Sequence, residues 1–434
     1  MRRMKDRAAA ALVLAGLVVI GLLIFLFRLV ADGENWAGYS ANRHAYQDGV
    51  LKSGEITDRN GEMLLSMQDG KYIYNDDYAL RTSTLHAVGD WRGYISGAMH
   101  TYAGKLSGYS FINGTPDGGA QIRLALDANL QTAAWDALKG RNGAVIVLNY
   151  RTGEVLCMVS SPSYDPNGSP DTSVDGLFLN RAIGAAFTPG SVFKLVTLIA
   201  AKEEMPDLSD RLFTCKKTLE VGGDVVTCGK SHGAQTIEEA LQNSCNCVFG
   251  ELALELGGET LAKYADKLGV TQYLQLDGLT TAAGNFSVAE PGTSYEAWSG
   301  IGQYEDLVTP LAMARLCAAV ANGGVAKEPT LLLNGKSKSA RLMSGETADF
   351  VRMCMLLDVE DGYGSDRFPG LLVGGKTGTA EVGDGTTHAW FTGFSDDGLP
   401  LAFAVVLERG GGGSKQAIPL ANKVLQKAAE IYRQ

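Results

Sequence analysis

A serine and a lysine, Ser191 and Lys194, stand three residues apart. Thr188 and Pro189 suit the cap and first position of a helix, which would place both side chains on one face, one turn apart. Residues 192–201 are apolar almost throughout, so they predict a buried helix. Burial disfavours the ammonium form, so Lys194 could be a base that activates Ser191 as a nucleophile. From this pair alone, a lysine that reaches the surface from a half-buried helix is an equal alternative.

A second group with useful chemistry is Ser244-Cys245-Asn246, near the start of a predicted helix over residues 244–256. The hydroxyl of Ser244 could relay protons, and the amide of Asn246 could hold a peptide group of a substrate. The alternative is an ordinary helix cap. Residues 40–42 match the same pattern, so this motif alone has little weight.

A third group is Lys376-Thr377-Gly378-Thr379, on a predicted strand that two preceding glycines interrupt. The ammonium of Lys376 and the hydroxyls of Thr377 and Thr379 suit a ligand that carries a carboxylate. Gly378 has no side chain, so a substrate could approach the backbone closely. The alternative is an exposed strand whose polar residues face water.

The elements that must position these groups predict an α+β domain. Asp127 can cap a helix over residues 128–138. A long helical section over residues 180–321 separates strands near the two ends of the domain, so those strands must meet in one sheet. The predicted strands are residues 122–126, 143–148, 154–159, 371–382, 388–394 and 401–407, followed by a helix over 419–432.

The N-terminal segment predicts a membrane anchor. Residues 8–27 carry no charge and are long enough as a helix to cross a bilayer, and residues 1–7 are basic. The positive-inside rule places that tail in the cytoplasm and the rest of the chain outside. A cleaved signal peptide is the less favoured alternative, because its apolar core is usually shorter and ends at a small-residue site.

Four parts are therefore predicted along the chain. They are a cytoplasmic tail over residues 1–7, a transmembrane anchor over 8–30, a small, mostly β spacer domain over 31–121, and the larger domain over 122–434. Within the spacer, Asn60-Gly61 between strand-like stretches is a strong hairpin signal.

Composition excludes several classes of protein. The chain has 434 residues, of which 45% are hydrophobic and 20% charged, as in globular proteins with a core. The net charge of -10 disfavours nucleic acid as a partner, since phosphate binding needs a basic face. The sequence lacks an H-E-x-x-H motif, so a zinc peptidase is not expected.

The seven cysteines do not form a dense disulfide framework. Cys215 and Cys228 flank a predicted hairpin with glycines at its turn, and they could pair in an oxidising compartment. Cys245 and Cys247 look like a metal motif, but no second cluster accompanies them in sequence and His232 is the nearest histidine, so neither a metal nor a cofactor is expected. Three further cysteines in apolar surroundings predict small core residues: Cys157, Cys317 and Cys354.

In this order along the chain, the Ser-x-x-Lys, Ser-x-Asn and Lys-Thr-Gly groups resemble the signature of penicillin-binding proteins and related β-lactamases. The chain as a whole resembles the monofunctional, class B-like penicillin-binding proteins, which are peptidoglycan D,D-transpeptidases. Further segments that resemble this family are residues 54–61, 126–131, 143–145, 161–167, 180–182, 187–191, 301–303, 308–311 and 389–391.

The resemblance implies roles for the catalytic residues. Ser191 would attack the penultimate D-Ala carbonyl of a stem peptide, and Lys194 would take its proton. Ser244 would relay a proton towards the leaving D-Ala. The backbone N–H groups of Ser191 and Thr379 would form the oxyanion hole.

It also implies the binding residues and the fold. Asn246 would bind the peptide amide, and Lys376 with Thr377 and Thr379 would hold the terminal carboxylate beside Gly378. The fold would be that of a serine transpeptidase or β-lactamase, with a five-stranded antiparallel sheet flanked by helices.

The resemblance further implies acylation by β-lactams, a single-pass plasma-membrane protein whose catalytic domain is extracytoplasmic, and a membrane partner that polymerises glycan. The alternatives are a D,D-carboxypeptidase or β-lactamase-like hydrolase that uses water as acceptor, a β-lactam sensor, and a non-catalytic scaffold of the cell-wall machinery.

Overall fold

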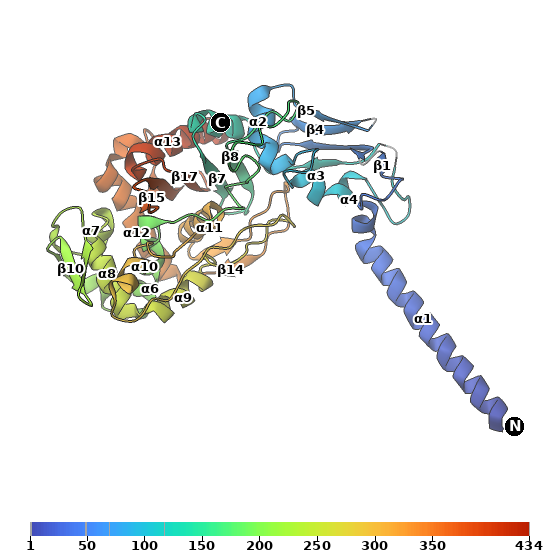
Figure 1. Ribbon diagram of the computed structural model, residues 1–434, viewed down its shortest axis with the longest axis horizontal. Coiled ribbons are helices and arrows are strands. Elements are labelled where there is room, and N and C mark those ends of the chain that lie inside the picture. The colour runs from blue at the N-terminus through green and yellow to red at the C-terminus, as the bar shows by residue number, and fades with distance from the viewer. Residues whose placement is uncertain (1, 48–49, 69, 117, 434) are drawn as a thin grey trace. The chain divides into compact units, whose positions relative to one another are not determined.

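A computed structural model describes residues 2–47, 50–68, 70–116 and 118–433 (Figure 1). The chain divides into two compact units whose segments alternate in sequence. The smaller unit comprises the chain up to Thr57 with Met63–Asn75 and Ala98–Ile122, and the larger comprises Asp58–Glu62, Asp76–Gly97 and the chain from Arg123 onwards. A single domain boundary between residues 121 and 122 remains a prediction.

The smaller unit begins with the long helix α1 (Arg2–Ala37). Within the described part of the chain, only this helix is both long and apolar enough to cross a membrane, and its apolar side chains are exposed. The unit also holds a four-stranded sheet in the order β5-β4-β3-β6. Strands β3 (Ser53–Thr57) and β4 (Met63–Gln68) pair as the hairpin predicted around Asn60-Gly61. The remaining elements are β1 (Tyr46–Gln47), β2 (Val50–Leu51), β5 (Lys71–Tyr74), β6 (Gln121–Arg123), α3 (Ala98–Thr101) and α4 (Ala103–Leu106).

The larger unit is built on the predicted five-stranded antiparallel sheet, in the order β15-β16-β17-β7-β8. Its strands are β7 (Gly143–Asn149), β8 (Val155–Ser161), β15 (Val373–Glu381), β16 (Thr387–Ser395) and β17 (Leu401–Leu407). Strand β17 pairs with β7, with Leu401 opposite Asn149 and Leu407 opposite Gly143. The strands from the two ends of the domain therefore meet in one sheet, and β15 forms its edge.

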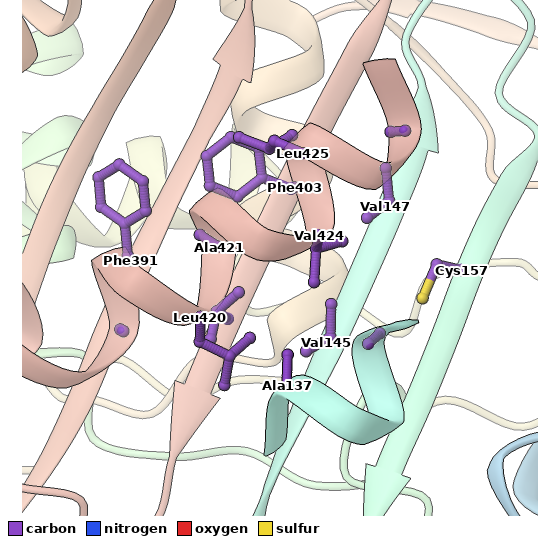
Figure 2. Packing of buried hydrophobic residues seen from close by; sticks show 14 of the residues in the cluster. Ala137, Val145, Val147, Cys157, Phe391, Phe403, Leu420, Ala421, Val424 and Leu425 are labelled. Atoms are coloured by element: carbon purple, nitrogen blue, oxygen red, sulfur yellow. The ribbon is translucent and has the colours of Figure 1, made fainter. Parts of the chain in front are cut away.

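Helices cover both faces of this sheet, which is why its central strands are continuous apolar runs (Figure 1). On one face, α5 (Ala128–Leu138) and α13 (Gly413–Tyr432) close the main core, where Leu420 and Val424 lie over Val145 and Val147 (Figure 2). Asp127 caps α5 as predicted, accepting hydrogen bonds from the backbone N–H groups of the first turn. Helix α13 begins at Gly413, six residues before the predicted start at Pro419. Pro419 lies inside the helix. Helix α11 (Pro310–Ala321) packs against β7, β16 and β17.

The section between the strands is mainly helical, as predicted, and it carries a small β region. Its hairpin, β10 (Thr218–Val221) and β11 (Asp224–Thr227), turns at Gly222 and Gly223, which both have positive φ. Strands β9 (Phe213–Cys215) and β12 (Gly233–Gln235) pair beside it. Besides α5, α11 and α13, the described α-helices of the unit are α2 (Tyr78–Val88), α6 (Lys194–Glu204), α7 (Ile237–Gln242), α8 (Asn246–Leu256), α9 (Gly258–Lys267), α10 (Ser294–Ser299) and α12 (Gly345–Leu357). The short strands β13 (Val325–Lys327) and β14 (Ser339–Arg341) pair with each other.

Candidate active site

Ser191 lies in a separate turn in front of helix α6. Residues Gly190–Val192 form a 3-10 turn, and the α-helix begins only at Lys194. The predicted cap by Thr188 and first position at Pro189 were wrong, because Gly190 has a φ of 54° and interrupts the helical backbone. The backbone carbonyl of Thr188 instead accepts a hydrogen bond from Trp390 Nε1 at 3.0 Å, which ties the turn to β16.

Lys194 is fully buried, as the apolar helix predicted, and its amine faces the Ser-x-Asn group. Its Nζ donates to the backbone carbonyl of Ser244 at 2.7 Å and to Asn246 Oδ1 at 2.8 Å. It also lies 3.2 Å from Ser244 Oγ, which is 2.9 Å from Ser191 Oγ. These contacts connect the hydroxyl of Ser191 to the amine of Lys194 through the hydroxyl of Ser244.

The environment of Lys194 favours the neutral amine. Burial, followed by the charge of Lys376, lowers the pKa of Lys194 to about 7. Its hydrogen-bond partners are a carbonyl, an amide oxygen and a hydroxyl, none of which carries a charge. A substantial share of Lys194 is therefore neutral near pH 7 and can accept a proton.

The Lys-Thr-Gly group lies on the edge strand β15, beside the turn that holds Ser191. A Cβ atom at Gly378 would stand 2.5 Å from the carbonyl oxygen of Pro189, so only glycine permits this approach of strand and turn. Thr379 is exposed, and its Oγ1 accepts a hydrogen bond from the backbone N–H of Gly413 at 3.1 Å. Strand β15 thus holds Thr379 near Ser191 through a contact that depends on Gly378.

Two residues that the sequence analysis missed surround Lys376. Asp358 and Tyr363 lie on the π-helical turn η3 (Asp358–Gly364) that follows α12. Lys376 Nζ lies 3.3 Å from Asp358 Oδ2 and donates to Tyr363 OH at 3.0 Å. The same phenol accepts from the backbone N–H of Thr377 at 3.1 Å and lies 2.8 Å from Thr377 Oγ1. Nothing in the Gly- and Asp-rich segment 358–366 signals this role in sequence.

These partners keep Lys376 charged. Burial alone would lower the pKa of Lys376, but the carboxylate of Asp358 and the hydroxyl of Tyr363 outweigh it, so the pKa lies above its usual range. Burial raises the pKa of Asp358 to about 6 against the opposing effect of Lys376. The site therefore holds two buried lysines in opposite states, a charged Lys376 and a Lys194 that deprotonates near neutral pH.

A cleft of about 490 Å³ opens onto these groups. Ser191, Asn246 and Thr379 line it together with the aromatic side chains of Tyr295 and Trp298. Lys194 and Lys376 are fully buried. The cleft combines apolar walls with a few convergent polar groups, as small-molecule sites usually do.

The eight predicted site residues thus fall into two connected clusters. Ser191, Lys194, Ser244 and Asn246 are joined by hydrogen bonds, while Lys376 and Thr377 are joined through Tyr363. Gly378 and Thr379 link the second cluster to the cleft. Such an arrangement can activate a serine, hold a peptide amide and balance an anionic group.

Comparison with known proteins identifies the fold and the family. Residues 143–426 match the family model described as the penicillin binding protein transpeptidase domain. The chain belongs to this family. The predicted fold class and the resemblance to penicillin-binding proteins are thereby confirmed, and the chain is a transpeptidase-type penicillin-binding protein.

Relatives with curated names are peptidoglycan enzymes and a sporulation protein. The chain is 28% identical over 368 residues to the peptidoglycan D,D-transpeptidase PbpA of Mycobacterium tuberculosis, and the match covers 74% of each protein. It is 34% identical over 298 residues to stage V sporulation protein D of Bacillus subtilis, covering 62% of this chain and 46% of that protein.

Solved structures of penicillin-binding proteins superpose on most of the chain. The ceftriaxone acyl-enzyme complex of penicillin-binding protein A from M. tuberculosis has a TM-score of 0.75 at 25% identity and covers 87% of this chain and 98% of that one. Penicillin-binding protein 2 of Pseudomonas aeruginosa has a TM-score of 0.74 at 26% identity, with coverages of 86% and 95%.

The cysteines are arranged differently from the expectation. Cys215, Cys228, His232 and Cys245 lie together, so the expectation that no cluster accompanies Cys245 was wrong. Folding of the β region brings the distant segments to the start of α8, which spacing along the chain does not reveal. All seven cysteines are free thiols, including Cys215 and Cys228. Cys157, Cys317 and Cys354 are buried, as predicted.

Proposed function

We propose that the chain is a peptidoglycan D,D-transpeptidase in which Ser191 forms the acyl-enzyme. The single observation that carries the proposal is the path of contacts from Ser191 Oγ through Ser244 Oγ to the buried amine of Lys194. A serine hydroxyl becomes a nucleophile when an adjacent base can remove its proton. The family and its acyl-enzyme complexes with β-lactams support the same chemistry.

In the acylation step, Ser191 Oγ attacks the carbonyl carbon of the penultimate D-Ala of a stem peptide. The proton of Ser191 passes to Lys194, and the backbone N–H groups of Ser191 and Thr379 stabilise the oxyanion. The peptide C–N bond then breaks. The terminal D-Ala leaves as an amine and takes a proton by way of Ser244.

In the second step, the amine of another stem peptide attacks the ester carbonyl. The C–O bond to Ser191 breaks, Ser191 regains a proton and a cross-link forms. Asn246 would hold the peptide amide of the donor. Its side chain is held for this task, because its Nδ2 donates to the carbonyl of Thr227 at 2.8 Å.

The terminal carboxylate of the donor would bind at the Lys-Thr-Gly strand. Thr379 offers an exposed hydroxyl to the cleft, and the buried charge of Lys376 lies behind the strand. Thr377 is already bonded to Tyr363, so Thr379 is the better candidate for direct contact with the carboxylate. A β-lactam carries a carboxylate of its own and would occupy the same place.

The apolar helix α1 supports a membrane anchor. We propose that it is a single span of the plasma membrane with the basic residues 1–7 inside and the catalytic unit outside. A transpeptidase of this kind would act beside a membrane enzyme that polymerises glycan.

The test is an acceptor assay on the full-length protein in detergent. A synthetic stem peptide that ends in D-Ala-D-Ala is the donor, and a second peptide with a free side-chain amine is the acceptor. The proposal expects release of D-Ala together with the joined peptide, both lost in Ser191→Ala. Release of D-Ala with only a hydrolysed donor would favour the carboxypeptidase. No release by a folded protein that binds the donor would favour a scaffold.

A further inference from the structure

The side chains of Cys215, Cys228, Cys245 and His232 form a cluster beside the Ser-x-Asn group. One ligand atom from each residue lies within 4.8 Å of the other three, and the three cysteines are buried. Cys228 Sγ and Cys245 Sγ are 3.6 Å apart. Sulfurs on the corners of a zinc tetrahedron are about 3.8 Å apart when each Zn–S bond is about 2.3 Å. Binding would draw the ligand atoms together by no more than about an ångström.

We propose that these four side chains form a structural zinc site. Three thiolates and one imidazole are a complete tetrahedral set for Zn²⁺, with no position left open for a substrate. Soft sulfur ligands also select zinc over magnesium or calcium, which prefer oxygen. The ion would therefore hold the fold of this region and take no part in the acyl transfer.

The surroundings of the cluster suit a metal thiolate. Cys228 Sγ accepts hydrogen bonds from the backbone N–H groups of Asn246 at 3.0 Å and Cys247 at 3.3 Å. Hydrogen bonds of this kind stabilise a thiolate, the form in which cysteine binds a metal. In addition, the buried Nδ1 of His232 has no hydrogen-bond partner among the described residues, and a metal would satisfy such an atom.

A cross-link of this kind would stabilise the local fold. Strands β9 and β12 have three residues each, and β10 and β11 have four each. Two-stranded sheets of this size are marginally stable in water, and most side chains of β10, β11 and β12 are at least partly exposed. Zinc would tie the end of β9, the segment between β11 and β12 and the start of α8 to one point.

The site would also position two catalytic groups. Cys245 stands between Ser244 and Asn246, and Cys228 follows Thr227, whose carbonyl accepts from Asn246 Nδ2. Ser244 has a φ of 47°, a strained backbone for a residue other than glycine, which persists only where its surroundings hold it. A bound ion would hold Ser244 and Asn246, the two neighbours of Cys245, in contact with Lys194.

The first test is the metal content of the full-length protein, purified in detergent without added metal or chelator. We expect about one zinc ion per chain by elemental mass spectrometry. Cys215→Ser and His232→Gln should lower that content, while Cys247→Ala is the matched control, since Cys247 neighbours the cluster and is no part of it. Zinc in the control and its loss in both ligand variants support the site. Equal zinc in all four proteins would overturn it.

A ligand variant that unfolds would lose zinc whether or not the residue is a ligand. A second measurement therefore uses the wild-type protein. Cobalt(II) added after chelation should give the visible bands of a tetrahedral site and the charge-transfer bands of thiolate ligands. Failure of the wild-type protein to bind either metal would overturn the proposal. This holds whether mass spectrometry finds seven free thiols or a Cys228–Cys245 disulfide. A disulfide would assign this pair to redox chemistry instead.

The effect on the active site is a separate readout that rests on the proposed function. We expect chelation to slow acylation by a β-lactam roughly tenfold, the order of effect that supporting residues of metal sites have on activity. Added zinc should restore the rate. If the protein contains zinc but acylates at the same rate after the zinc is removed, the metal site is supported and its role in positioning the catalytic groups is overturned. The metal measurement stands even if the chain proves to have no transpeptidase activity.

Discussion

Asp358 Oδ2 lies 3.3 Å from Lys376 Nζ, and both side chains are fully buried. Lys194, the other buried lysine of the site, has only uncharged hydrogen-bond partners. The carboxylate therefore decides which lysine stays charged and which can deprotonate near neutral pH. This separation of two like groups by their surroundings is how acid and base roles are assigned within one site.

The first prediction concerns Asp358→Asn. Removing the carboxylate leaves a buried ammonium without its counter-charge, a change that typically costs about 3–5 kcal/mol of unfolding free energy. We also expect slower acylation, because the Lys-Thr-Gly strand loses its support. Denaturant unfolding and the acylation rate of the full-length protein measure the two effects. Tyr363→Phe is the matched comparison and should cost less, about 1.5–3 kcal/mol, since it removes hydrogen bonds to charged groups but leaves the counter-charge of Lys376 in place. Equal losses in the two variants would contradict the account.

The second prediction is the pH dependence of acylation. The pKa of Lys194 is lowered to about 7, and only the neutral amine can accept the proton of Ser191. The neutral fraction grows as pH rises, so the acylation rate constant should rise through about pH 7 and level off above it. Below that pH it should fall about tenfold for each unit. Lys376 stays charged throughout, because its pKa is raised.

The pH profile is read by stopped-flow acylation with a chromogenic β-lactam. Lys194→Ala removes the base and should abolish acylation while the protein stays folded. Normal acylation in this variant would remove Lys194 from the mechanism. So would a wild-type rate that is constant between about pH 6 and pH 8, since the neutral fraction changes most in that range.

The third prediction separates Ser244 from the rest of its motif. Ser244 Oγ is the contact between Ser191 Oγ and Lys194 Nζ, at 2.9 Å and 3.2 Å. Ser244→Ala should lower the acylation rate about 10²-fold or more, the range for loss of a proton-transfer group. Affinity for the β-lactam before acylation should change little, because Asn246 and Thr379 remain. An unchanged rate would mean that Ser191 reaches Lys194 without this relay.

The fourth prediction concerns Gly378→Ala. The added Cβ would stand 2.5 Å from the carbonyl of Pro189 and 3.2 Å from Val192 Cγ1, so the Ser191 turn and β15 must separate. Overpacking of this kind costs about 1–3 kcal/mol, and acylation should fall because Thr379 moves away from Ser191. Gly383→Ala is a control further along the same chain segment, where a Cβ meets open space but φ is 81°. Acylation as fast in Gly378→Ala as in the control would contradict the close approach.

The sheet and the three catalytic groups could be predicted from sequence for a simple physical reason. Strands buried on both faces are continuous apolar runs, so 143–148 and 401–407 are visible without any tertiary information. The motifs are equally local, because Ser191 and Lys194 need only one turn of chain between them.

The parts that the sequence did not predict depend on tertiary contacts. Asp358 lies in a polar, glycine-containing stretch that is typical of an exposed loop, and only the fold places its carboxylate against Lys376. Cys215 and His232 are likewise distant from Cys245 along the chain, and the pairing of β9 with β12 brings them together. The break before Lys194 depends on a positive φ at Gly190, and a glycine alone does not specify that value.

The central claim is that Ser191 is an acylated nucleophile, and labelling of the full-length protein by a fluorescent penicillin tests it most directly. Intact mass spectrometry and peptide mapping locate the adduct, with Ser191→Ala as the control. The account predicts a single, slowly hydrolysed adduct on Ser191 that is lost in the variant. Rapid turnover of the drug would point to a β-lactamase. An adduct on another residue, or none on a folded wild-type protein, would contradict the account.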